Sequence, residues 1–249
     1  MRLRRCLLLA ACTAFVLAVL QPTWGVCADG PVDVDASAFG ANVPSRMACG
    51  PDVRVKYGGI GGQVATHLGD DAGRRPGTGF VLGAGAAGAY DHVLLLGPCR
   101  SPTTNCAVPP SFFEGVIAGR LGYDWSWFGF RAGILFWGVR DGGFPFPDFS
   151  LRFGAVDGVR FVAGLGAYDV PTMLRPGLYA GLLAPLEKGW ELELHVGQHL
   201  GIAGLASVRA HGGMHAPIGP RSWLSLGGAL WANELGVGPE GDLGWGSRF

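Results

Sequence analysis

The sequence has little charge. Lys, Arg, Asp and Glu together make up 15% of its 249 residues, whereas ordinary globular domains contain about a quarter. Positive and negative residues cancel to a formal net charge of +0, so the basic excess typical of nucleic-acid-binding proteins is missing. We therefore expect no nucleic-acid partner, and a surface that shows water less charge than a soluble domain does.

A long apolar run is missing as well. Beyond residue 28 the sequence holds no uncharged apolar stretch of the roughly 20 residues that a membrane-spanning helix needs. Mean hydropathy is nevertheless positive, at +0.29, and glycine is abundant, with 44 residues. Strands whose side chains alternate between lipid and a polar interior combine these properties. The composition therefore favours a membrane protein built from strands.

The N-terminus has the layout of a secretory signal. An apolar run over residues 6–20 leads to small residues at 26–28, and it follows three basic side chains: Arg2, Arg4 and Arg5. This order is typical of a signal peptide that is removed on export. We predict a signal peptide over 1–28 and a single mature domain over 29–249. Two alternatives stay open: an uncleaved membrane anchor, and a lipid anchor on Cys12.

Three cysteines lie clearly in the mature part. In an exported protein, Cys99 and Cys106 are plausible partners for a disulfide across the proline-rich segment that separates them. A metal site would need further ligands close by, and none are evident. Cys49 is either free or bonded to a partner that the sequence does not identify.

Alternation of apolar and polar side chains is the clearest structural pattern. In segment 190–197 one face of an extended chain carries Glu191, Glu193 and His195, and the other carries Trp190, Leu192, Leu194 and Val196. A strand separates these two sets completely, whereas a helix would mix them. Segment 128–137 repeats the pattern over ten residues, the length of a tilted membrane strand.

The strand-like segments predict an all-β, antiparallel, up-and-down transmembrane β-barrel of 10–12 strands. Eleven segments qualify, and because bacterial single-chain barrels have an even number of strands, we expect ten or twelve. Segment 32–39 is the most plausible addition, and 53–68 the most plausible place for a miscount. The eleven segments are 53–57 (running on toward 68), 79–95, 115–123, 128–137, 149–155, 159–167, 177–183, 190–197, 205–211, 222–231 and 241–249.

The connections fit this topology. If the last strand ends in the periplasm, the short turns lie on that side, and the longer segments 97–111 and 140–148 lie outside the cell. For the turn at 156–158 we predict a three-residue loop with Gly158 in the left-handed conformation, because this loop pairs Phe153 with Phe161 and keeps the two faces apart.

Charged residues at the strand positions that face inward predict a polar lumen. An ionic network that fills the barrel is one interpretation, and a narrow pore whose charges set selectivity is the other. The predicted lumen-facing residues are Arg131, Arg152, Arg160, Glu191, Glu193, His195, Arg209, His211 and Arg248.

Two motifs point to ligands but have simpler explanations. Segment 83–88 fits the dinucleotide fingerprint G-x-G-x-x-G, yet no carboxylate follows at the distance that ribose binding requires. His195 and His211 could share a face with Glu193 if 198–204 formed a turn, but a solvated or hydrogen-bonded cluster is the expected outcome. We therefore predict no metal, no cofactor and no catalytic residue.

The last residues, DLGWGSRF, resemble the C-terminal strand of bacterial outer-membrane β-barrel proteins, with Leu243, Trp245 and the terminal Phe249 on one face. Ser247 departs from the family's pattern, which usually has a hydrophobic residue there. The resemblance implies a location in the bacterial outer membrane, contact with its lipid, and recognition of this strand by the barrel-assembly machinery.

A second resemblance argues against an enzyme. Segment 198–203, which contains His199, is similar in layout to the catalytic segment of outer-membrane lipid A deacylases. This chain has Gly201 where that family has its nucleophilic serine, so the chemistry does not carry over. We predict a non-enzymatic outer-membrane barrel with a structural role, or a small passive channel for small solutes. The alternatives are an exported soluble periplasmic β-protein that binds a ligand or partner, and a lipid-modifying barrel enzyme.

Overall fold

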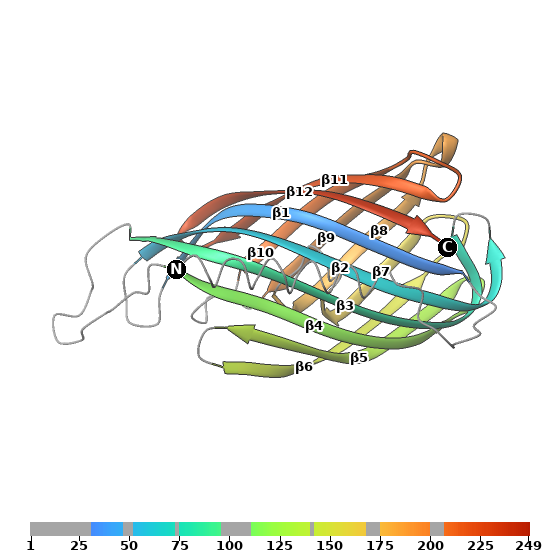
Figure 1. Ribbon diagram of the computed structural model, residues 1–249, viewed down its shortest axis with the longest axis horizontal. Helices are drawn as coiled ribbons and strands as arrows, with labels where there is room; N and C mark the ends of the chain where they lie inside the picture. Colours follow the sequence, from blue (N-terminus) through green and yellow to red (C-terminus); the bar gives the residue numbers. More distant parts are fainter. Residues whose placement is uncertain are drawn as a thin grey trace.

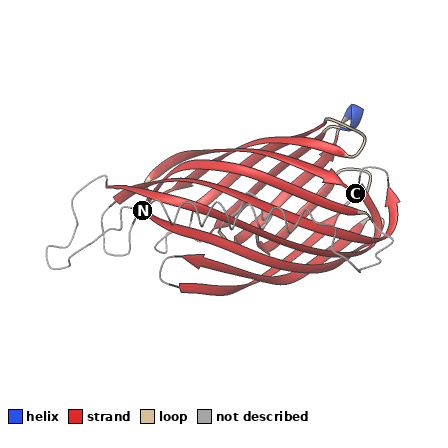
Figure 2. Ribbon diagram, viewed as in Figure 1, coloured by secondary structure: helices blue, strands red, loops and turns tan. Residues whose placement is uncertain are grey.

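The computed structural model describes residues 31–46, 52–72, 75–95, 111–139, 142–167, 175–199 and 207–249. One short 3₁₀ turn, η1 (Glu187–Gly189), interrupts an otherwise all-strand structure in this part of the chain (Figure 2). None of the helical residues described forms a segment long and apolar enough to cross a membrane. The strands are β1 (Val32–Arg46), β2 (Asp52–Ala72), β3 (Arg75–Leu95), β4 (Ser111–Asp124), β5 (Phe128–Val139), β6 (Gly142–Phe153), β7 (Arg160–Gly166), β8 (Gly177–Pro185), β9 (Glu191–His199), β10 (Ser207–Pro217), β11 (Ser222–Asn233) and β12 (Gly236–Arg248).

The strands form a closed barrel in which each pairs with the next along the chain and β12 pairs back onto β1 (Figure 1). The seam is completed by two backbone hydrogen bonds, since the amide of Val32 donates to Phe249 and the amide of Phe249 donates to Val32, at 3.1 and 2.9 Å. Closure leaves no strand edge exposed along this seam. The predicted antiparallel up-and-down barrel is confirmed, and the described strands number twelve, the upper end of the expectation.

Two uncertain segments are now assigned. Segment 53–68 belongs to one long strand, β2, and the weak segment 32–39 belongs to β1, which supplies the twelfth strand. The prediction that 140–148 is a loop is wrong, because β6 begins at Gly142. The prolines of this segment were misleading as turn signals. Within the described part of the chain, residues 142–148 pair with β5 alone, and pairing with β7 starts at Phe149. Proline is tolerated on such an unpaired edge.

The turn after β6 has the predicted register but a different conformation. Phe153 pairs with Phe161, as expected. The positive φ lies at Gly154 (118°) and not at Gly158, so that part of the prediction is wrong. The chain turns directly after β6, where a Cβ on residue 154 would collide with the carbonyl oxygen of Val159. Glycine is therefore required at the start of this turn.

The barrel has an apolar outside and a polar inside. Large hydrophobic side chains project outward along all sides of the wall, among them Phe80, Ile117 and Leu226, whose exposed fractions are 60%, 65% and 65%. Most of the charged side chains that are buried belong to the opposite parity of the strands. A water-soluble domain has the reverse arrangement, so the outer wall suits contact with lipid.

Candidate functional site: the polar lumen

The candidate site is the interior of the barrel, which changes character along its axis. We call the end where Val32 and Phe249 meet the proximal end, and the other the distal end. We divide the lumen along the barrel axis into a proximal, a middle and a distal level. The position of a residue along its strand gives its level, and every second side chain of a strand points into the lumen.

At the proximal level, charged side chains of both signs surround a cavity of about 280 Å³. Neighbouring strands β4 to β7 contribute four arginines, and the carboxylates come mainly from β1 and β9. Arg131 pairs with Asp124 at 2.5 Å, and Arg248 pairs with Asp33 at 2.7 Å. The ionisable side chains that line the cavity are Arg120, Arg131, Arg152, Arg160, His67, Asp33, Asp35, Asp124 and Glu191.

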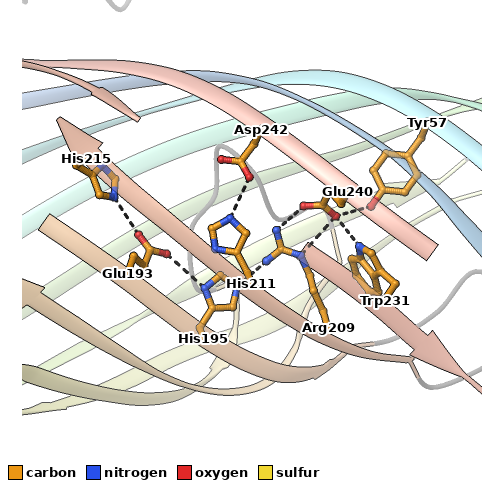
Figure 3. A network of polar contacts seen from close by, with 9 residues as sticks. All are labelled: Tyr57, Glu193, His195, Arg209, His211, His215, Trp231, Glu240 and Asp242. Carbon is orange, nitrogen blue, oxygen red and sulfur yellow. Dashed lines mark hydrogen bonds and ion pairs between the residues drawn. The ribbon is translucent and has the colours of Figure 1, made fainter. Parts of the chain in front are cut away.

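At the middle level, two histidines contact the Glu193 carboxylate, and a third, His211, lies close by (Figure 3). His195 of β9 and His211 of β10 are direct cross-strand partners, and their ring centroids lie 4.6 Å apart. One Glu193 oxygen lies 3.3 Å from Nδ1 of His195, and the other lies 3.2 Å from Nε2 of His215. Nε2 of His211 contacts the carboxylate of Asp242 at 2.9 Å.

On the distal side of the histidines, Arg209 is fully buried and joins the middle level to the distal one. Its Nε and Nη2 donate to the carboxylate of Glu240, and its Nη1 lies 2.5 Å from Nε2 of His195. Glu240 also accepts hydrogen bonds from the Tyr57 hydroxyl, at 2.9 Å, and from the Trp231 indole, at 2.5 Å. Hydrogen bonds from three side chains therefore hold the Glu240 carboxylate in place.

At the distal level, Arg175 reaches across the lumen. It precedes β8, yet its guanidinium donates to Glu114 of β4 at 3.2 and 3.3 Å. Its charged carbon also lies 5.3 Å from the ring centre of Tyr57 and 5.8 Å from that of Trp231. These contacts belong to strands on opposite sides of the barrel.

The β7–β8 connection thus enters the lumen at both of its described ends. Ala167, which follows β7, is buried in an apolar cluster together with Phe39, Val55, Phe112 and Leu135. Arg120 donates to the carbonyl oxygen of Ala167. Ion pairs and apolar packing therefore constrict the distal half of the lumen.

A closed twelve-stranded wall that is apolar outside and polar inside decides the structural class. The fold is that of a bacterial outer-membrane β-barrel. No protein-family model matches the sequence, and no curated protein matches it.

Among solved structures, the chain is similar to a low-pH structure of OprB from Pseudomonas putida, with 8% identity, coverage of 88% of this chain and 93% of that one, and a TM-score of 0.37. It is also similar to the translocator domain of the autotransporter NalP from Neisseria meningitidis, with 10% identity, coverages of 99% and 96%, and a TM-score of 0.39. The chain is similar as well to an anion-selective porin from Comamonas acidovorans, with 9% identity, coverage of 88% of this chain and 98% of that one, and a TM-score of 0.36. Likeness at this level does not bear on function.

The predicted lumen residues all lie on the interior side of the wall. Arg152 and Glu191 are half-buried beside the proximal cavity, and the other seven are buried. The structure brings together Glu193, His195, Arg209 and His211, as the cross-strand alternative required. It does not join them to the proximal arginines of β5 to β7.

Sequence reasoning missed part of this site. Glu114, Asp148 and Glu240 lie just beyond the strand ends that we predicted, although each continues the inward parity of its strand. Extending the alternation by a few residues would have found them. Arg175 carried no such signal, since it precedes its strand.

The remaining predicted features fall into three groups. Residues 1–28, Cys49, Cys99 and Cys106 lie outside the described residues. Leu243, Trp245 and Phe249 lie exposed on the outer face. Segment 83–88 lies inside β3, which continues as a strand to Leu95, where the dinucleotide fingerprint needs a helix to begin. His199 points into the lumen, where Nδ1 lies 3.1 Å from the carbonyl oxygen of Arg175.

Proposed function

We propose that this protein is an outer-membrane barrel that acts as a narrow passive channel for small solutes, with its proximal end toward the periplasm. The observation that carries the proposal is the charged cavity of about 280 Å³ in the proximal half of the lumen. A cavity lined by both signs of charge admits water and small polar solutes, and its charges influence which ones enter.

The membrane location is supported by two features of the outer wall. Apolar side chains cover it, and aromatic rings gather near the proximal turn between β4 and β5, where Tyr123 lies 4.6 Å from Trp125 and 4.9 Å from Phe80 between ring centres. Aromatic girdles of this kind mark the interface between lipid and water. The same apolar wall argues against the soluble periplasmic alternative, because water would face it directly.

Membrane fractionation with gel mobility tests the location. The folded barrel is expected in the outer-membrane fraction, with a mobility in detergent that changes on boiling. A soluble protein without this shift would refute the barrel and its location together.

Conductance in planar lipid bilayers tests the channel. We expect small conductance from the wild-type protein, because the contact between Arg175 and Glu114 crosses the distal lumen. Arg175→Ala removes the side chain that crosses, so conductance is expected to rise several-fold. Arg221→Ala is the matched control, because Arg221 is exposed at a proximal turn, and it should leave conductance unchanged.

A structural barrel with a closed lumen is the second candidate, and the Arg175 contacts favour it specifically. If neither the wild-type protein nor Arg175→Ala conducts, the channel is refuted and the structural role stands. The lipid-modifying alternative has less support, because His199 is buried in the lumen and does not face the lipid.

A further inference from the structure

The histidine cluster at the middle of the lumen has the composition and spacing of a metal site. Glu193, His195 and His211 each offer one ligand atom, and these atoms all lie within 4.8 Å of one another. Two features of the fold produce this grouping. Glu193 and His195 are two residues apart on β9, so they share a face, and His211 is paired directly with His195 across to β10.

We propose that Glu193, His195 and His211 bind a divalent transition-metal ion of the Zn²⁺ class inside the lumen. Two imidazole nitrogens and one carboxylate oxygen are a donor set that such ions accept, with bonds of about 2.0–2.2 Å. Bonds of this length in a tetrahedral site place ligand atoms roughly 3.4 Å apart. Small side-chain rotations therefore close the present spacing. Three protein ligands leave a fourth position for water or a passing solute.

The groups around the three ligands are arranged as metal ligands require. Nδ1 of His211 is buried and has no hydrogen-bond partner among the described residues, while Nε2 of the same ring is held by Asp242. A carboxylate on the outer nitrogen of a histidine fixes the ring and increases its basicity toward a metal. His215 holds the second oxygen of Glu193 at 3.2 Å, which orients that carboxylate.

Charge also favours a divalent cation. The network of Figure 3 contains the carboxylates of Glu193, Glu240 and Asp242 and a single guanidinium, that of Arg209. With neutral histidines these four groups sum to −2, counting −3 and +1, and one divalent ion cancels this charge.

One contact must change. Nη1 of Arg209 lies against Nε2 of His195. Because the guanidinium is planar and Glu240 holds it through Nε and Nη2, Nη1 stays in place. The ring of His195 therefore has to turn away from Nη1, whether the metal binds Nε2 itself or binds Nδ1 and leaves a proton on Nε2.

Zn²⁺ titration of the full-length, tag-free barrel in detergent, in competition with a chromophoric chelator, tests the proposal. The wild-type protein is expected to bind one Zn²⁺. Asp242→Asn should weaken binding by about 10–100-fold, and His195→Asn and His211→Asn by more. His67→Asn is the matched control, because His67 is also a lumen histidine beside a carboxylate, Asp33 at 3.3 Å. It should bind as the wild type does.

Absence of binding by the wild-type protein, or equal binding by all variants, would overturn the proposal. Boiled and unboiled mobility shows which variants fold. X-ray absorption of the Zn²⁺-loaded wild-type protein is independent of any variant. Imidazole ligands at about 2.0–2.1 Å are expected, and a shell of oxygen alone would refute the site. Neither measurement depends on conductance, so a failure of the metal-site proposal can be told apart from a failure of the channel proposal.

Discussion

Inward-facing residues of the same strands line both halves of the lumen, but the two halves are filled differently. The proximal half places arginines on β4 to β7 and leaves a cavity between them and the carboxylates of β1 and β9. The distal half has its own charges, on Glu114, Arg175, Arg209 and Glu240, and these meet at hydrogen-bond distance among aromatic and apolar side chains. The alternation of side chains along each strand places polar residues inside the barrel. Whether a cavity remains between them depends on how far those side chains extend across the lumen.

The largest expected effect tests whether the distal half depends on its ion pairs. Glu240→Gln keeps the shape of the side chain but leaves Arg209 buried without its counter-charge. We expect the free energy of unfolding to fall by about 3–5 kcal/mol, measured by denaturant unfolding in lipid vesicles. Glu187→Gln, at an exposed turn position, should change it by less than about 0.5 kcal/mol. A loss no larger than that of the control would mean that water reaches Arg209.

A smaller effect is expected in the proximal half. Asp124→Asn weakens the contact with Arg131, but that guanidinium lines the cavity and can be hydrated there. We expect a loss of about 1–3 kcal/mol in the same unfolding measurement. A loss as large as that of Glu240→Gln would contradict the distinction between a hydrated half and a packed half.

The smallest effect concerns one hydrogen bond at the constriction. Trp231→Phe retains an aromatic ring between Arg175 and Arg209 and removes the donor to Glu240. Stability should fall by about 0.5–1.5 kcal/mol. Iodide quenching of tryptophan fluorescence gives a second readout, because the substitution removes a buried indole and should raise the quenched fraction. An unchanged fraction would mean that Trp231 is already open to water.

The wall of the barrel was largely predictable from the sequence. Segment 190–197 separates its two faces by parity, and the match of Phe153 with Phe161 follows from keeping those faces apart. The errors came from local signals. Prolines at 145 and 147 indicate a loop, although β6 accommodates them on an edge that has no partner among the described strands. The turn prediction placed the left-handed glycine at Gly158, whereas the positive φ lies at Gly154.

The site was less predictable than the wall. Parity places His195, Arg209 and His211 inside, but it does not say that Arg209 holds Glu240 or that Asp242 holds His211. Those partners lie about 31 residues away along the chain. The spacing between partners depends on barrel closure and on strand register, which are properties of the assembled sheet.

By itself the sequence determined the all-β class and the number of strands to within two, because strand periodicity is a local property of the chain. Only the tertiary structure decided that Arg175 spans the lumen and that His195 and His215 contact Glu193 while His211 contacts Asp242. It also decided that the cavity lies in the proximal half. Each of these depends on side chains from non-neighbouring segments meeting across a closed barrel, and no local pattern in the sequence encodes such a distance.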